Sequence, residues 1–349
     1  MFKYIKYLNP LIMYALAYIS FTNTGFICWL TMIYSWVFVP TLELLIKPDT
    51  KNMAAAELEL AKHDKVYDYL LYLVVFIQIG TLFFFLNSFK GAELSTIDIV
   101  ARITAMGMLC GVFGINVAHE LGHRNTKFEQ WLAKISLLTS MYTHFFIEHN
   151  KGHHKNVATP NDPSSARYNE WVYRFYFRTI SLTYTHAWHI ANAEMRKKGK
   201  AIFSIYNEML QLQIMQLVLL TSIYFLFGGI ILIYFLGAAF IGILLLETVN
   251  YIEHYGLQRK QTGDNKFERA QPQHSWNSNH VIGRMLLFEL SRHSDHHYLA
   301  SRKYQILQHH ENAPQLPTGY PGCLLLALVP PLWCSIMNKK IAASSTTVD

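Results

Sequence analysis

The sequence predicts an all-α polytopic membrane protein with six transmembrane helices and a histidine-rich cap on the cytosolic side. Hydrophobic residues make up 52% of the 349 residues and charged residues only 15%, with a mean hydropathy of +0.15. A soluble domain carries about 25% charged residues. Several apolar stretches reach the roughly 20 residues that a helix needs to cross a bilayer. The chain also contains seventeen histidines, many of them in short clusters.

Six apolar stretches define the expected transmembrane helices, at residues 9–26, 27–46, 67–89, 99–119, 206–227 and 229–251. The first two stretches are joined by the polar turn FTNTG and the last two by FGG, so each pair is expected to form a helical hairpin. The segments 120–205 and 252–349 are not expected to span and form the predicted cap. Residues 1–349 are therefore expected to form one membrane-bound domain.

The distribution of basic residues sets the expected orientation. Only Lys90 and Arg102 lie in or beside the connections on one side, whereas the other 28 of the 30 Lys and Arg residues lie on the opposite side. The positive-inside rule places that side, with both termini, in the cytoplasm. No small-residue cleavage site follows the first apolar run, so we expect an uncleaved first helix. The same distribution explains the net charge of +7 without a nucleic-acid partner.

Four histidine groups lie at or beyond the expected cytosolic helix ends. Spacings of three and four residues bring side chains to one face of a helix, and neutral imidazole is the commonest metal ligand. The groups are NVAHELGHR, FIEHNKGHHKN, ETVNYIEHYGL and LSRHSDHHYLAS, and their histidines are His119, His123, His149, His153, His154, His254, His293, His296 and His297. This pattern predicts a metal site at the cytosolic ends of the helix bundle.

The number of histidines narrows the choice of metal. HELGH also matches the zinc protease pattern H-E-x-x-H, with Glu120 as general base, but that interpretation uses only two of the nine histidines. Nine nitrogen donors exceed the four of one tetrahedral zinc site and suit two metals. A metal transporter would place its ligands near the bilayer midplane, where these spans contain few polar or ionisable residues. Imidazole suits zinc, copper, iron and nickel, and two metals facing an apolar interior favour iron and oxygen chemistry.

The four motifs resemble, in order and spacing over about residues 100–300, the integral-membrane alkane monooxygenases of the AlkB type. These share a superfamily with xylene monooxygenases and membrane fatty acid desaturases. VATPNDPSSAR and HSWNSN are also similar. Desaturases usually have H-x-x-H-H in the second motif, whereas this chain has H-x-x-x-H-H, and it also has the HYG motif. Both differences favour the hydroxylase branch, and the change to Arg124 from the Lys of many relatives keeps a basic residue.

The resemblance implies a non-haem di-iron centre held by all nine histidines, in a six-helix protein with its site on the cytosolic side. It also implies O2-dependent terminal hydroxylation of medium-chain n-alkanes to 1-alkanols. Electrons would come from rubredoxin and, upstream, an NADH-dependent rubredoxin reductase, because the chain has no C-x-x-C pair and no dinucleotide-binding glycine fingerprint. Hydroxylation of alkyl-aromatic methyl groups is the nearest alternative, and a fatty acyl desaturase or a zinc protease is more remote.

Other residues are expected to support the metals or to bound the substrate. A residue next to a ligand points about 100° away on a helix, so we expect neighbouring carboxylates to orient ligands from other groups or to pair with nearby cations. These carboxylates are Glu120, Glu148, Glu253 and Asp295, and Asn250 lies one helical turn before His254. An alkane offers no polar group, so channel shape would set its length. Bulky residues that either line this channel or simply pack are Trp29, Trp36 and Phe84.

Overall fold

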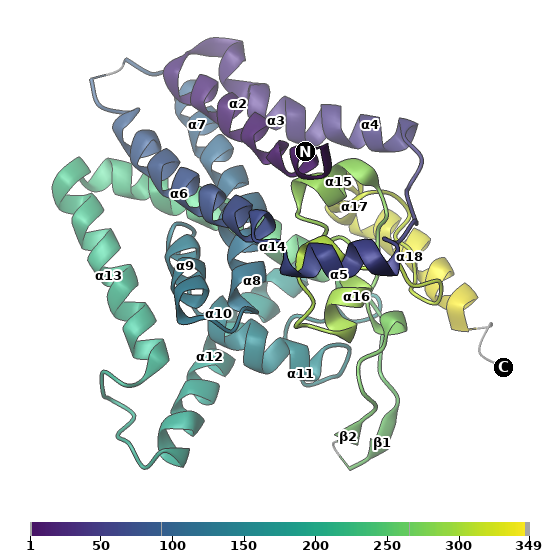
Figure 1. Cartoon of the computed structure of the whole chain (residues 1–349). Coiled ribbons are helices and arrows are strands. Elements are labelled where there is room, and N and C mark those ends of the chain that lie inside the picture. The colour runs from purple at the N-terminus through teal and green to yellow at the C-terminus, as the bar shows by residue number, and fades with distance from the viewer. Residues whose placement is uncertain (1, 92, 265, 346–349) are drawn as a thin grey trace. The chain divides into compact units, whose positions relative to one another are not determined.

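The computed structural model describes residues 2–91, 93–264 and 266–345, which form helices and one short β-hairpin (Figure 1). The predicted all-α class is therefore confirmed. The chain divides into two compact units, each assembled from three segments. Unit 1 comprises Met1–Val37, Lys65–Asn150 and Tyr184–Leu246, and unit 2 comprises Phe38–Asp64, Lys151–Thr183 and Glu247–Asp349.

Unit 1 contains most of the long apolar helices. Its elements are α1 (Phe2–Ile5), η1 (Lys6–Leu8), α2 (Pro10–Thr22), η2 (Gly25–Trp29), α3 (Leu30–Ile33), α6 (Val66–Asn87), α7 (Thr96–Leu109), η4 (Cys110–Ile115), α8 (Asn116–Gly122), α9 (Lys127–Leu138), α10 (Phe145–Glu148) and α13 (Glu208–Phe227). The boundary between the units falls within η3 (Tyr34–Phe38), η5 (His149–His153), α12 (Val172–Lys197) and α14 (Gly229–His254). The elements η3, η4 and η5 are π-helical turns, and η1 and η2 are 3₁₀ turns.

Five helical runs in the described residues are long and apolar enough to cross a membrane: Gly25–Leu45, Val66–Asn87, Thr96–Gly122, Glu208–Phe227 and Gly229–His254. The span expected at 9–26 corresponds to α2, which has only 13 residues. It follows a 3₁₀ turn and ends at Thr22, because Asn23 has an extended backbone. The structure therefore supports a membrane protein, but the expected count of six spans is not reached by helix length.

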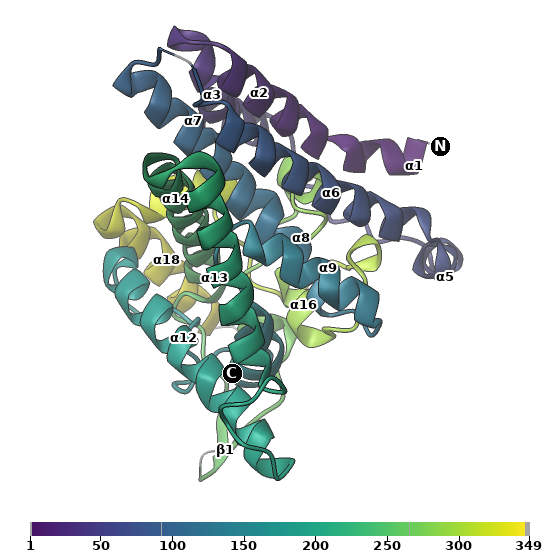
Figure 2. The same cartoon turned by 90° about the vertical axis from the view of Figure 1, so that its left-hand side faces the viewer.

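Close helix packing in unit 1 fixes the helix that leads to the first histidine motif. In both views α2, α6 and α7 lie side by side, and α9 lies beside α8 (Figures 1 and 2). A Cβ atom at Gly242 of α14 would lie 2.6 Å from the Cβ of Cys110, and one at Gly111 would lie 2.7 Å from Leu245 Cδ2. Small residues let helix backbones approach in this way. The run from α7 through η4 to α8 is thereby held against α14.

Unit 2 contains shorter elements and the hairpin. They are α4 (Val39–Leu45), α5 (Ala55–His63), α11 (His154–Asn156), β1 (Gln261–Gly263), β2 (Lys266–Phe267), η6 (Pro272–His274), α15 (Val281–Leu286), α16 (His293–Tyr298), η7 (Tyr304–Ile306), α17 (Tyr320–Ala327) and α18 (Pro330–Ser345). The two strands pair antiparallel and project below α16 in Figure 1. The buried Arg292 guanidinium, just before α16, donates to the carbonyls of Lys51 and Leu307, each at 2.8 Å. These bonds fix the start of the helix that carries the last histidine motif.

Candidate metal centre

The first two histidine motifs contribute a unit 1 histidine triplet, which we define as His119, His123 and His149. α8 carries His119 and ends beside His123, and η5 begins at His149. The ring centroid of His119 lies 5.0 Å from that of His123 and 4.1 Å from that of His149. The Nε2 atoms of His123 and His149 are 3.1 Å apart. The i, i+4 spacing of HELGH therefore does place two imidazoles together, and His149 joins them.

An aromatic side chain supports the unit 1 histidine triplet. Phe145 of α10 stacks on the His149 ring at 4.6 Å and meets the His119 ring edge-on at 6.0 Å. His119 and His149 are buried, whereas His123 is half-buried. The triplet thus has an apolar side, formed by Phe145, and a side that is closer to solvent at His123.

The other motifs form a four-histidine cluster in unit 2, defined as His153, His254, His293 and His297. His153 ends η5, His254 ends α14, and α16 supplies the other two. One ring nitrogen from each of the four lies within 4.8 Å of those from the others. The Nε2 atoms of His153 and His297 are 3.2 Å apart, as are those of His254 and His293. All four side chains are buried, with His254 fully so.

The spacing and chemistry of the four-histidine cluster suit a metal ion. Two nitrogens that each bind one ion at about 2.1 Å are about 2.9–3.4 Å apart at square or tetrahedral angles, which matches the two 3.2 Å contacts of the cluster. Two neutral imidazole nitrogens at this distance do not stabilise each other unless a proton or a cation lies between them. Burial also holds the pKa of His297 well below its usual value, so its ring is neutral and has a lone pair to donate.

His154 and His296 form a further pair in unit 2. Their Nε2 atoms are 3.1 Å apart and their ring centroids 4.8 Å apart. Burial, and then the neighbouring His153, lower the pKa of His154 to about 3. His154 also stacks on His297 at 4.5 Å between ring centroids. His154 is therefore neutral, and the pair adjoins the four-histidine cluster.

The predicted supporting carboxylates of unit 1 contact groups outside the nine histidines. Glu120 accepts a hydrogen bond at 2.6 Å from Arg124, which lies four residues later, just beyond the end of α8. Glu148 lies 3.1 Å from Nδ1 of His186 on α12. The Arg124 contact is the cation pairing that the sequence left open as an alternative, whereas His186 was not anticipated because it lies in another segment.

The predicted carboxylates of unit 2 differ from each other in their surroundings. Glu253 lies 3.2 Å from Nε2 of His293 and accepts a hydrogen bond from the buried Tyr320 hydroxyl at 2.7 Å. Asp295 lies 2.6 Å from Nε2 of His310 and pairs with Arg302. Glu253 is therefore directly beside the four-histidine cluster, whereas the contacts of Asp295 run to the segment after α16.

Asn250 lies on α14, one turn before His254, and its amide donates to the Glu247 carboxylate at 3.2 Å. Glu247 is 1% exposed and also accepts from Thr179 at 2.9 Å. Glu247, Asn250 and His254 follow the spacing i, i+3, i+7, which places them on one helix face. Glu247 is not among the residues predicted from sequence, although a carboxylate inside an apolar span is a recognisable signal of function.

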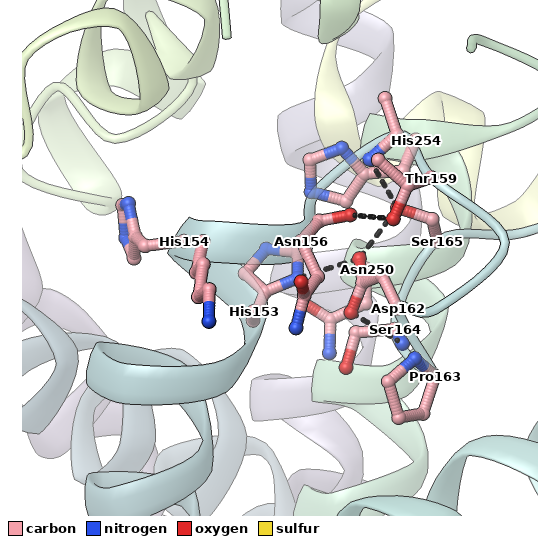
Figure 3. Close-up of polar contacts among 12 residues, drawn as sticks. His153, His154, Asn156, Thr159, Asp162, Pro163, Ser164, Ser165, Asn250 and His254 are labelled. Atoms are coloured by element: carbon pink, nitrogen blue, oxygen red, sulfur yellow. Dashed lines mark hydrogen bonds and ion pairs between the residues drawn. The ribbon is translucent and has the colours of Figure 1, made fainter. Parts of the chain in front are cut away.

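Asp162 is the second residue that sequence reasoning missed. It lies in the NDPSS loop after the second histidine motif, and its Oδ2 is 2.9 Å from Nδ1 of His153 (Figure 3). Burial alone would raise the pKa of Asp162, but the contacts with His153 and Ser165 outweigh it and lower the pKa. The signal was present, since Asp followed by Pro and Ser is typical of a side chain that bonds its own loop, but the histidine it would reach was not readable.

The three residues named for a substrate channel all lie in unit 1. Trp29 ends η2 and Trp36 lies in the π turn η3, and both are half-buried. Phe84 of α6 is 36% exposed and stacks on Tyr18 at 5.1 Å. These positions fit packing against neighbouring side chains or lipid as well as they fit a channel wall, so the channel role stays a prediction.

A pocket of about 350 Å³ reaches the histidines of unit 2. His154 and His297 lie among its lining residues, together with the basic side chains of Lys155, Arg259 and Arg269. Lys155 and Arg269 are exposed, whereas Arg259 is half-buried and donates to the Lys155 carbonyl at 2.8 Å. Two candidate ligands are therefore reached through an opening that carries positive charge.

Comparison with known proteins places the chain in a family. The family model described as fatty acid desaturase matches residues 98–325. The chain is 36% identical over 318 residues to alkane 1-monooxygenase 2 of Alcanivorax borkumensis, covering 90% of this chain and 83% of the relative. It is 37% identical over 320 residues to an alkane 1-monooxygenase of Pseudomonas putida, covering 92% and 79%. A more distant relative is the hydroxylase component of a Pseudomonas putida xylene/toluene monooxygenase, 28% identical over 250 residues, covering 70% and 64%.

These matches extend over most of the chain, and the region of the family model contains all four histidine motifs. They agree with the apolar helices and with the histidine clusters that suit a metal. The family resemblance carried by the sequence motifs is confirmed. The chain belongs to the alkane 1-monooxygenase family of membrane oxidoreductases, within the larger group that the fatty acid desaturase model describes.

Proposed function

We propose that this protein hydroxylates the terminal carbon of medium-chain n-alkanes to give 1-alkanols, with O2 as co-substrate, at a non-haem di-iron centre. The observation that carries the proposal is the four-histidine cluster, in which buried imidazoles approach one another at metal-ligand spacing. The relatives named alkane 1-monooxygenase support the substrate class. All nine predicted histidines hold the two iron ions, and the four-histidine cluster holds one of them.

The reaction consumes one alkane, one O2, two electrons and two protons, and it yields one alcohol and one water. Bound iron supplies the activation of O2 and the transfer of one oxygen atom to carbon, and the chain supplies the rest. Its histidines hold the metals, and burial keeps bulk water from the four-histidine cluster. We propose that Glu253 and Asp162 orient ligands. The orienting roles of Glu120, Glu148, Asp295 and Asn250, and the channel roles of Trp29, Trp36 and Phe84, likewise stay predictions.

Six transmembrane helices in a bacterial inner membrane, with both termini and the site in the cytoplasm, remain our proposed topology. The asymmetry of Lys and Arg supports it. A sixth span would require α1, the 3₁₀ turn η1 and α2 to cross the membrane together as one helical run. Labelling single introduced cysteines from each side of the membrane tests this topology, and a terminus labelled only from the periplasm would contradict it.

We propose rubredoxin, reduced by an NADH-dependent reductase, as the electron donor. The positive pocket at His154 and His297 supports an acidic carrier, because opposite charge steers association and the carrier would stop beside candidate ligands. In steady-state assays, Lys155→Glu and Arg269→Glu should raise KM for rubredoxin and weaken its salt dependence. Lys62→Glu, on a half-exposed side chain of α5, is the matched control and should change neither.

The substrate proposal is tested with purified protein in lipid, a reconstituted rubredoxin system and a series of n-alkanes, with xylene and fatty acyl substrates alongside. We expect 1-alkanols to be the main products, and two irons per chain by metal analysis. Preferred turnover of xylene would favour the alternative, hydroxylation of alkyl-aromatic methyl groups, for which the xylene/toluene relative is the supporting observation. New double bonds in acyl chains, or one zinc per chain with peptide cleavage, would overturn the proposal.

A further inference from the structure

We propose that Asp162 is a positioning residue that sets the tautomer and the donor strength of His153 within the four-histidine cluster. This inference rests on the metal-binding part of the proposed function. Nδ1 of His153 lies 2.9 Å from Asp162 Oδ2, while Nε2 of the same ring lies 3.2 Å from Nε2 of His297. The ring therefore points one nitrogen at the Asp162 carboxylate (Figure 3) and the other at His297 of the cluster.

The loop orients the Asp162 carboxylate on both oxygens. The Ser165 hydroxyl donates to Oδ2 at 2.5 Å, and the Ser164 N–H donates to Oδ1 at 3.1 Å. Asp162 and His153 are 2% and 1% exposed. The carboxylate is acceptor-only when ionised, so the proton of the neutral imidazole resides on Nδ1. The Nε2 lone pair is then directed into the cluster, and the carboxylate makes it more basic.

The loop is tied to the segment that follows the cluster ligand His254. Ala158 has a φ of 55°, in the left-handed region, and its N–H donates to the Ser165 hydroxyl at 2.9 Å. Its carbonyl accepts from the Arg259 N–H at 2.8 Å, and the Ala166 carbonyl accepts from the Gly256 N–H at 2.9 Å. Gly256 and Arg259 closely follow His254. A left-handed non-glycine residue is held only where its surroundings fix it, and these bonds fix the loop beneath the cluster.

At Nδ1, two other rings of the cluster have weaker partners than His153 has. His254 Nδ1 lies 3.5 Å from the Ser275 hydroxyl, at the limit of a hydrogen bond. His297 Nδ1 is buried and has no hydrogen-bond partner among the described residues. At Nδ1, His153 thus has a charged hydrogen-bond partner, whereas His254 has a weak one and His297 has none among the described residues. A metal in the cluster would have His153 as a stronger donor than His297.

The test is Asp162→Asn, which keeps an acceptor for the Nδ1 proton but removes the charge. Affinity for Fe(II), and for Co(II) as a spectroscopic probe, is measured by competition with a chelator, and the reduction potential of the iron-loaded protein is measured by titration. We expect affinity to fall about 10- to 100-fold, the potential to rise and the Co(II) absorption bands to shift. Glu170→Gln is the matched control, since Glu170 is a buried carboxylate in the same segment but pairs with Arg178.

Unchanged affinity, potential and Co(II) bands in Asp162→Asn, with only a lower unfolding temperature, would overturn the inference and leave a structural role. The same changes in Glu170→Gln would overturn it too. Failure of the proposed function would give a different set of results. If the wild-type protein hydroxylates no alkane but Asp162→Asn still weakens Fe(II) binding, the substrate proposal fails and this inference stands.

Discussion

The unit 1 histidine triplet and the four-histidine cluster of unit 2 are built in different ways. In the triplet, two histidines come from one helix at i, i+4, and an apolar ring, Phe145, packs on the third. In the cluster, the histidines come from the ends of η5 and α14 and from α16, and a loop carboxylate orients one of them. His123 of the triplet is half-buried, whereas all members of the cluster are buried.

This difference predicts which substitutions should disturb the geometry of each histidine set. Helical periodicity fixes the spacing of His119 and His123 locally, whereas His149 joins them through the packing of another element. The cluster depends on chain segments about 40 to 140 positions apart in sequence, so its geometry depends on tertiary contacts. We therefore expect variants around the cluster to disturb metal binding through the fold, and variants around the triplet to act through single side chains.

Loss of a cluster histidine should have the largest effect. His254 is fully buried and lies at the end of α14, and no neighbouring donor replaces it in His254→Ala. We expect activity to fall by more than about 100-fold, beyond the loss seen for supporting residues, together with loss of iron from the protein. Activity assays and metal analysis check this, with the exposed His63→Ala as control. Full activity in His254→Ala would show that the histidine of the HYG motif is not a metal ligand.

A large side chain at Gly242 should disturb the helix packing that supports the triplet. A Cβ there already comes within 2.6 Å of the Cβ of Cys110, so Gly242→Leu should destabilise the protein by about 1–3 kcal/mol. Thermal unfolding in detergent measures the change. Gly80→Leu is the control, because a Cβ at Gly80 of α6 meets nothing within 4 Å. Equal stability of the two variants would show that close packing at Gly242 is unimportant.

Removal of the Tyr320 hydroxyl should have a smaller effect, centred on the cluster. Tyr320→Phe leaves one oxygen of the buried Glu253 carboxylate without its donor, which costs about 1–3 kcal/mol. Unfolding measurements should show this loss, and chelator competition should show weaker iron binding through His293. Tyr173→Phe, which loses a hydrogen bond to the Leu328 carbonyl at an exposed position, should change neither.

The smallest expected effect is on the pH dependence of stability. Burial alone would raise the pKa of Glu170, but hydrogen bonds from Arg178 and from the Arg167 N–H outweigh it, so the pKa lies below its ordinary value. A lowered folded-state pKa stabilises the protein above the unfolded value of about 4.3, and this stabilisation is lost as the pH falls through the folded value. The stability difference between wild type and Glu170→Gln should therefore shrink in acid. A difference that grows as the pH falls would contradict the assignment.

The local parts of the fold and the site were predictable from sequence, and the tertiary parts were not. Apolar runs located five spans, and the HELGH spacing placed His119 and His123 together, because both depend only on helix periodicity. The length of α2 was overestimated, since hydropathy does not register the break at Asn23. The contacts of Asp162 with His153 and of Glu148 with His186 depend on how segments fold back, which periodicity does not encode.

The π turn η5 gives a structural meaning to the spacing of the second motif. It runs from His149 to His153, and a π turn takes one residue more than an α turn because its hydrogen bonds run from i to i+5. The H-x-x-x-H-H spacing likewise has one residue more than the desaturase pattern. An insertion of a single residue would thus be absorbed as a wider helical turn. The two branches of the superfamily would then differ here by an indel inside a helix, and deleting one residue between His149 and His153 would restore an ordinary α-helical turn.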